Sequence, residues 1–445
     1  MSNWTTLLAR HGFEKADLDQ AKVGHNTNTM FLNQALTLAG CHDLDQEPVT
    51  ERAWIQALEQ AAEHTQGRGR ETIVYPVKEE LPLQDIDPYM RGIVRWLNEL
   101  GIYTVYSCDG HDRGCAYVRL KKCLSFQQMS TIKACLPQGL KVRFEGKRVS
   151  FFYQQGEISK LLDMGERLYQ VKQSEEKVLY FEAEQFKQRV IELLKHGGSS
   201  GNEREIRQFL QRKLRKLTDY TYVDHAGNLL AYLYCGEGPT VLISAHMDIY
   251  EDIKPGRTII ENGTQLFSSE GILGADDRAG IAVILEVLSR IQRTNFAGTF
   301  KIAFTVKEET GCIGSKQIDP HFIEDADAAI VADRRGTRDI VISYGGMIPF
   351  CPQSYGHLFE QADALCGMYD WRMTAGGLSD AKVFAEKGIP SVNLSVGYMN
   401  EHSKEETLDY RAAYETAKLI ESVLHHNLIK GAFDRELHNS VYSLS

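Results

Sequence analysis

The second half of the chain contains several apolar runs that end at, or just before, acidic or imidazole side chains. Uninterrupted apolar runs that alternate with segments of helical spacing are typical of strands buried on both faces of a parallel sheet. An unpaired charge at the end of such a strand is costly to bury, and metal coordination is one way to offset that cost. Four such segments and a later polar loop carry these residues: Ala245–Asp248, Gly274–Asp277, Lys307–Thr310, Val331–Arg334 and Asn400–Ser403.

This alternation predicts an α/β fold for residues 183–430, with a mostly parallel, mixed sheet covered by helices on both faces. Because the carboxyl ends of parallel strands meet at one edge of an open sheet, the polar segments should meet there as well. The expected helices are 183–195, 203–217 and 280–291, and the expected strands are 221–224, 229–234, 240–244, 299–306 and 328–332.

At 445 residues, the chain is expected to form two or three domains. Residues 1–175 should form a separate, smaller α+β domain, helical over 1–80 and α+β over 84–170, and residues 431–445 a C-terminal tail. Asp85 or Asp87 can cap a helix that Gly101 ends. The other elements expected in this domain are a helix at 126–135 and strands at 103–107, 116–121, 141–145 and 149–153.

Composition excludes several classes of function. The net charge of −10 argues against a nucleic-acid partner, which clustered Lys and Arg would attract. No apolar run approaches the ~20 residues of a membrane span, and the first 20 residues lack the pattern of a secretory signal. Nine scattered cysteines then indicate reduced thiols and a cytoplasmic location. The sequence leaves the oligomeric state open.

The five polar segments supply what a pair of divalent ions needs: a bridging carboxylate, end ligands on either side, and a base. His246, Asp276 and Asp333 can serve one ion, and Asp276, Glu309 and His402 the other. Glu308 would then be the general base, and Asp248 would accept from the His246 imidazole and orient it. Mixed histidine and carboxylate ligands favour zinc, with cobalt or manganese as further candidates.

The residues from about 183 to 430 resemble the co-catalytic two-metal aminopeptidases and their relatives, peptidase families M28, M20 and M42. The flanking sequence segments that carry the resemblance are 198–203 (GSSGNE), 224–229 with Gly227-Asn228, 308–315 (EETGCIGS) and 377–390 (GGLSDAKVFAEKGIP). The resemblance implies that Asp276 bridges the ions, although Asp277 stays an alternative, and that Glu308 is the acid/base. The ligands that it implies are His246, Asp276, Glu309, Asp333 and His402, with Asp248 behind His246.

Two spacings narrow the layout within this group. Family M42 inserts a domain between its His-x-Asp pair and the bridging Asp, but only 28 residues separate Asp248 from Asp276. Family M20 inserts a lid domain before its last His, but only 69 residues separate Asp333 from His402. The layout is therefore similar to that of M28, with a single catalytic unit. The resemblance does not extend to residues 1–175.

We expect a dinuclear metal-dependent hydrolase, an aminopeptidase that cleaves short peptides by means of a metal-bridging water and Glu308. One alternative is a deacylase or carboxypeptidase acting on N-acyl amino acids or small amides, which needs an arginine such as Arg372 in the cleft. The other alternative is a non-catalytic regulatory protein with an inherited metal site. Arg334, Arg335 and Arg338 can also bind a substrate carboxylate. Arg334 and Arg335 directly follow a proposed ligand, and for these two we favour the alternative that they balance the negative charge of the site.

A loop in the N-terminal domain, Ser107–His111, also carries metal-binding residue types, with Cys115 and Cys123 nearby in sequence. Its spacings lack the paired C-x2-C ligands of common zinc sites. We therefore expect a structural or small-ligand loop here, with a metal site as the alternative.

Overall fold

A computed structural model of the protein describes residues 4–21, 27–41, 48–63 and 81–430. The chain forms two units, residues 1–182 and 183–445, and helix α8 (Lys177–Leu194) crosses the boundary between them. The predicted C-terminal tail, 431–445, and the end of the predicted helical region, 64–80, lie outside the described residues. No helix among the described residues is both long and apolar enough to span a membrane.

The described residues of the first unit before position 64 form four helices, but the expected cap of the next helix is wrong. Asp85 lies in a 3-10 turn, and α5 begins only at Arg91, without a side-chain cap. Asp87 instead accepts a hydrogen bond from the backbone N–H of Asp109. Gly101, at φ +76°, follows the helix as expected. The helices are α1 (Trp4–Arg10), α2 (Lys15–Ala21), α3 (Thr27–Leu38), α4 (Glu51–Glu63) and α5 (Arg91–Glu99).

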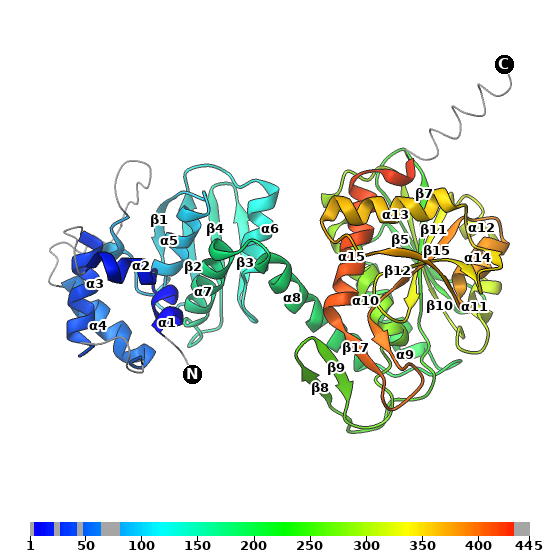
Figure 1. Ribbon diagram of the computed structural model, residues 1–445, viewed down its shortest axis with the longest axis horizontal. Helices are drawn as coiled ribbons and strands as arrows, with labels where there is room; N and C mark the ends of the chain where they lie inside the picture. Colours follow the sequence, from blue (N-terminus) through cyan, green and yellow to red (C-terminus); the bar gives the residue numbers. More distant parts are fainter. Residues whose placement is uncertain (1–3, 22–26, 42–47, 64–80, 431–445) are drawn as a thin grey trace, which may run out of the picture. The chain divides into compact units, whose positions relative to one another are not determined.

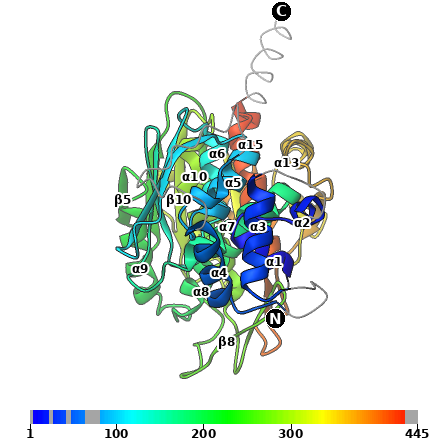
Figure 2. The same cartoon turned by 90° about the vertical axis from the view of Figure 1, so that its left-hand side faces the viewer.

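A four-stranded antiparallel sheet in the order β1-β2-β4-β3 completes the first unit. Helices α5 and α7 pack against each other (Figures 1 and 2). The apolar side chains of both share one core with the sheet. The strand ends fall within one residue of the predicted ones. The elements are β1 (Thr104–Cys108), β2 (Cys115–Leu120), α6 (Phe126–Ala134), β3 (Lys141–Glu145), β4 (Arg148–Phe152) and α7 (Lys160–Gln173).

The second unit is built on a mixed sheet whose centre is parallel, which confirms the predicted fold class. Its strand order is β13-β12-β15-β11-β7-β10-β6-β5, with β14 paired to β12. Strand β7 is parallel to β10 and β11, and β11 is parallel to β15, whereas β5 and β6 are antiparallel. The strands are β5 (Tyr220–Val223), β6 (Leu229–Tyr234), β7 (Thr240–His246), β10 (Thr299–Thr305), β11 (Ala328–Arg334), β12 (Asp339–Tyr344), β13 (Ile348–Pro349), β14 (Arg372–Gly376) and β15 (Ser391–Ser395).

Alternate side chains of the central strands feed two cores, one on each face of this sheet. Val241, Ile243 and Ala245 of β7 belong to one core, and Leu242 belongs to the other. The first core is covered by α8, α9 (Arg204–Leu214), α10 (Ala275–Arg290), α13 (Gln353–Cys366) and α15 (Tyr410–His425). The second is covered by α12 (Pro320–Ile323) and α14 (Asp380–Glu386), with α11 (Ile313–Lys316) beside α14 (Figure 1).

Helix α10 approaches the sheet closely at one glycine. A Cβ at Gly280 would lie 1.8 Å from the carbonyl oxygen of Ala332 in β11. Only glycine therefore lets the start of α10 reach the carboxyl end of that strand, which brings Asp276 and Asp333 to the same place.

A second sheet, which we did not expect from the sequence, has the order β16-β17-β9-β8. Its hairpin β8–β9 projects from the second unit in Figure 1, and its strands β16 and β17 flank the loop that carries His402. The strands are β8 (Ile259–Asn262), β9 (Gln265–Ser268), β16 (Tyr398–Met399) and β17 (Thr407–Asp409).

Candidate metal centre

The predicted site residues lie at the carboxyl ends of three neighbouring strands. His246 is the last residue of β7, Asp333 is near the end of β11, and Glu308 and Glu309 follow β10. Because β7 pairs in parallel with both other strands, these ends share one edge of the sheet. Asp276 and His402 reach the same edge from α10 and from the loop between β16 and β17.

His246 is buried and faces two carboxylates. Its Nε2 atom lies 3.0 Å from Asp276 Oδ1 and 3.4 Å from Asp333 Oδ1. Its other ring nitrogen, Nδ1, lies 3.0 Å from the backbone oxygen of Asp248 and 3.4 Å from the Asp248 carboxylate. Asp248 thus contacts the ring nitrogen that faces away from Asp276 and Asp333 and so orients the ring. The shorter of its two contacts is made by its backbone carbonyl and not by its carboxylate.

His402 faces the other side of Asp276. Its Nε2 atom lies 3.2 Å from Asp276 Oδ2 and 2.8 Å from Glu309 Oε2. Its ring is stacked on Tyr250, with 4.5 Å between the ring centroids and 14° between the planes. Asp276 therefore lies between two groups of potential ligands, His246 with Asp333 and His402 with Glu309, and in each group the ligand atoms lie within 4.8 Å of one another.

The neighbouring acid, Asp277, has a different role. The backbone of Asp276 and Asp277 departs from helical geometry inside α10. Asp277 Oδ1 accepts from the N–H of Gly280 at 2.9 Å, and its Oδ2 accepts from the N–H of His246 at 3.2 Å. Asp277 thus caps the helical part of α10 that follows it, and Asp276 is the carboxylate that faces both histidines.

Asp248 connects the two halves of the site. Its Oδ1 accepts from the backbone N–H of Glu308 at 3.0 Å, and its Oδ2 accepts from that of Glu309 at 3.1 Å. The hydroxyl of Ser200 also donates to Oδ2, at 2.6 Å. Asp248 is completely buried; burial alone would raise its pKa, but the nearby His246, with the hydrogen bonds from Ser200 and from the N–H of Glu308, lowers the pKa of Asp248 to about 2. It is an ionised anchor for the acidic loop.

Glu308 lies at the rim of a cavity of about 620 Å³ that Asp276, Glu309, Asp333 and His402 also line. Burial, with the nearby Asp333, raises the pKa of Glu308 to about 9. The thiol of Cys312 donates to its carboxylate at 3.1 Å. Burial also raises the pKa of Asp333 to about 7. Carboxylates crowded in this way need positive charge beside them, and metal ions can supply it.

The arginines near the site are paired with acids. Arg335 lines the cavity and contacts Glu401 at 3.0 Å, and Arg334 contacts Asp339 at 3.5 Å. Arg338 binds Asp370 and Glu415. Arg372 donates to the carbonyl oxygens of Tyr369 and Trp371 and is not among the residues that line the cavity. Arg334 and Arg335 are therefore already paired, with acids that are not among the predicted metal ligands.

The sequence did not single out several side chains that hold the site in place. Glu406 accepts from the N–H groups of Gly274 and Asp276 at 2.7 and 3.0 Å. The hydroxyl of Tyr398 donates to Asp333 Oδ1 at 3.1 Å, and Asp380 accepts from Thr305 and Ser315 behind Glu308. Only Asp380 had a signal, since it lies in the segment 377–390. Glu406 looks like any acid in a polar loop.

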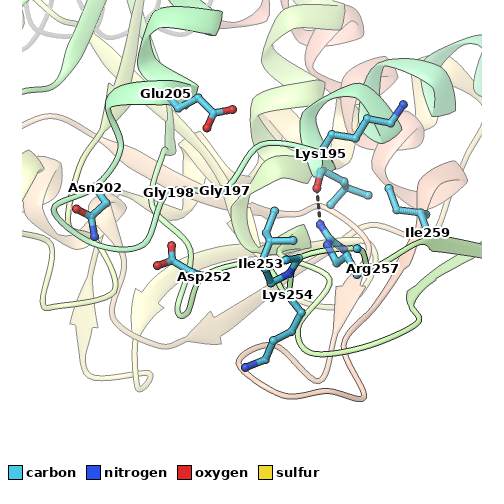
Figure 3. A pocket seen from close by; sticks show the side chains of 13 residues that line it. Lys195, Gly197, Gly198, Asn202, Glu205, Asp252, Ile253, Lys254, Arg257 and Ile259 are labelled. Atoms are coloured by element: carbon cyan, nitrogen blue, oxygen red, sulfur yellow. Dashed lines mark hydrogen bonds between the residues drawn. The ribbon is translucent and has the colours of Figure 1, made fainter.

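Another cavity of this unit, of about 530 Å³, lies beside the loop after α8 (Figure 3). Lys195, Lys254 and Arg257 line it together with Glu205 and Asp252. Arg257 donates to the backbone oxygen of Leu194, and Asp252 accepts from the N–H of Ser199. Both signs of charge are present in this lining, and no group of potential metal ligands among the described residues lies there.

Comparison with known proteins finds similarities in the second unit. Residues 251–419 match the model of the M42 glutamyl aminopeptidase family. This part of the second unit is therefore similar to the M42 peptidases. Its layout nevertheless differs from the one expected of M42, in which a domain is inserted between the His-x-Asp pair and the bridging Asp. Here the only strands or helices between Asp248 and Asp276 are those of the hairpin β8–β9 and the start of α10.

Individual similarities are partial. A curated relative, the uncharacterized protein YqjE of Bacillus subtilis (strain 168), is 32% identical over 143 residues, which are 30% of this chain and 38% of that protein. The chain thus spans well under half of that relative. The aminopeptidase PepT from Bacillus cereus ATCC 10987 has a similar fold, with a TM-score of 0.50 and 19% identity over 56% of this chain and 98% of its own. A tripeptidase from Staphylococcus aureus gives a TM-score of 0.49 and 18% identity over 55% of this chain and 98% of its own.

Proposed function

We propose that the protein is a dinuclear metal-dependent aminopeptidase that removes N-terminal residues from short peptides. One observation carries this proposal: the two oxygens of Asp276 lie 3.0 Å from His246 Nε2 and 3.2 Å from His402 Nε2. A carboxylate between two histidines, each with a further carboxylate, is the arrangement that two-metal hydrolases require.

The donor set fits the proposed ions. His246, Asp276 and Asp333 would hold one ion, and Asp276, Glu309 and His402 the other. Each group combines one imidazole with two carboxylates, which suits zinc first and cobalt or manganese next. Ions bound there would lower the pKa of a shared water and polarise the scissile carbonyl.

Glu308 would be the base and then the acid. Its side chain lines the same cavity as the ligands, and the hydrogen bond between its N–H and Asp248 fixes its backbone. We expect its carboxylate to take a proton from the attacking water and to pass that proton to the leaving amine. Asp248 would be a positioning residue, because it holds the backbone of Glu308 and Glu309 and orients the ring of His246.

The charge of the cavity favours a substrate with a free amine. Its lining contains five carboxylates and two guanidinium groups, and those guanidinium groups already face Asp339 and Glu401. Neither guanidinium group of the lining is therefore left to bind the additional carboxylate of an N-acyl amino acid, whereas a peptide with a free amine needs no such partner. The deacylase alternative is further disfavoured because Arg372 is not among the lining residues.

The test is Glu308→Gln, with Glu405→Gln as a matched control because Glu405 is exposed. We expect E308Q to retain both metal equivalents by elemental analysis and to lose at least ~100-fold in hydrolysis of aminoacyl substrates. Normal turnover by E308Q would contradict the role of Glu308. Preferential hydrolysis of N-acyl substrates by the wild type would favour the deacylase alternative. The absence of any hydrolysis by the metal-loaded wild type would favour the regulatory alternative.

We also propose a cytoplasmic location. All nine cysteines are free, including the buried Cys135, Cys312 and Cys351, which suits a reducing compartment.

A further inference from the structure

The first unit has a cavity of its own, of about 450 Å³, between the segment that precedes α5 and the end of β1. Four carboxylates line it, those of Glu59, Asp85, Asp87 and Asp109, against one guanidinium group, that of Arg91. This surplus of negative charge favours a cationic ligand. All of these residues belong to the first unit, and none of them lines the cavity of the proposed peptidase site.

Three residues at the edge of this cavity have the side chains of a metal site. A sulfur, a carboxylate oxygen and a ring nitrogen, from Cys108, Asp109 and His111, all lie within 4.8 Å of one another. We propose that these three residues bind a single divalent ion of the zinc class. A thiolate and an imidazole select zinc over magnesium or calcium, and three protein ligands leave a fourth position for water or a small ligand from the cavity.

The loop that carries these residues is held in place from several sides. The N–H of Asp109 donates to Asp87 at 3.0 Å, and the hydroxyl of Tyr153 donates to the Asp109 carbonyl at 2.7 Å. At Gly110, with φ +77°, a Cβ would lie 2.0 Å from the carbonyl oxygen of Cys115. Such outer contacts orient metal ligands in advance and reduce the cost of binding.

A buried hydroxyl at the same place points independently to a missing partner. Ser107 lines the cavity and is only 7% exposed. Its Oγ has no hydrogen-bond partner within the part of the chain that the structure describes. Because an unsatisfied buried hydroxyl costs about 1–3 kcal/mol, a water or ligand atom in the cavity is the natural partner for it.

The other cysteines near in sequence are not part of this group. Neither Cys115 nor the exposed Cys123 lies within the cluster of ligand atoms. The zinc alternative considered for this loop therefore narrows to one thiolate, from Cys108, with the adjacent carboxylate and imidazole.

The experiment is a metal count on the full-length protein, comparing wild type with Cys108→Ser, His111→Asn and the control Cys123→Ser. After loading with zinc and removal of excess, wild type and C123S should hold one equivalent per chain more than C108S and H111N. Loading with cobalt should give a thiolate-to-cobalt charge-transfer absorption, which C108S loses. Cys312→Ser should keep this absorption, which excludes the thiol beside the peptidase site.

Circular dichroism and a thermal transition at the wild-type temperature, both measured on metal-free protein, will show that C108S is folded. Equal zinc content in folded C108S and wild type, or a charge-transfer band that survives C108S, overturns the proposal. The peptidase proposal is tested separately by His246→Asn, which should lose metal from the second unit and keep the cobalt–thiolate band. If H246N keeps every equivalent while C108S loses one, the peptidase site fails and this site stands.

Discussion

The backbone N–H of Glu308 donates a 3.0 Å hydrogen bond to the buried carboxylate of Asp248. The same carboxylate accepts from the N–H of Glu309 and from the hydroxyl of Ser200, and the Asp248 carbonyl contacts the ring of His246. Asp248 thus connects the proposed base, Glu308, and a proposed ligand of one ion, Glu309, to a proposed ligand of the other ion, His246. Its position, two residues after β7, is what joins the ends of β7 and β10.

Asp248→Asn tests this connection. An amide group replaces one oxygen by a donor, which would face the backbone N–H of Glu308 or that of Glu309. We expect a 10- to 100-fold loss of kcat/KM or of metal affinity, measured by peptide hydrolysis and by chelator competition. Ser200→Ala removes only one of the three hydrogen bonds and should cost less. Activity of D248N within twofold of wild type would contradict the role given to Asp248.

Tyr250→Leu tests the stacking on His402. The aromatic contact should be worth about 0.5–1.5 kcal/mol. Its loss should therefore lower the affinity for the ion that His402 would bind by about two- to twelve-fold. The control is Tyr250→Phe, which keeps the ring and should behave as wild type. Metal titration resolves the two ions. An effect of Y250F as large as that of Y250L would show that the hydroxyl, and not the stacking, matters.

Glu406→Gln tests the anchor of Asp276. Two backbone N–H groups donate to the two oxygens of Glu406, which is 2% exposed. An amide can satisfy only one of them, so we expect a loss of about 1–3 kcal/mol in the free energy of unfolding, together with weaker metal binding. Chemical denaturation measures the first effect. The adjacent, exposed Glu405→Gln is the matched control, and equal stability of the two variants would refute the prediction.

His11, in the first unit, predicts a dependence of stability on pH. It is completely buried, and burial, with Arg91 and Arg10, lowers its pKa from 6.5 to about 3. In the unfolded chain His11 therefore binds a proton below about pH 6.5, whereas in the folded unit it binds that proton only below about pH 3. The contribution of His11 to stability is present above pH 6.5 and is lost as the pH falls through this window, by up to ~1.4 kcal/mol per pH unit.

Unfolding of wild type and His11→Leu between pH 7 and pH 4 measures this effect. H11L should be less sensitive to acid, because it removes one proton uptake on unfolding. The exposed His321→Leu, in the second unit, is the control and should keep the slope of wild type. A slope of H11L equal to that of wild type would show that His11 does not titrate in this window.

The sequence alone predicted the four strands of the first unit's sheet and five strands of the second unit's larger sheet, with the residues that the ends of those five carry. Strands β3 and β6 have the predicted bounds, and the ends of β7 and β10 differ by one or two residues from the predicted ones. The side-chain period of a strand and the breaks around it are local properties, so they can be read without knowledge of the fold. Parallel pairing then places the ends of such strands at one edge.

The tertiary structure decided what depends on contacts between distant segments. That Asp276 faces both histidines while Asp277 caps α10 follows from the local turn and from the approach of Gly280 to β11. Glu406 reaches the backbone of Asp276 across 130 positions of sequence, and Asp87 binds Asp109 instead of capping α5. A side chain's type and neighbours in sequence state what it can bind, but only packing between separate elements selects the partner that it does bind.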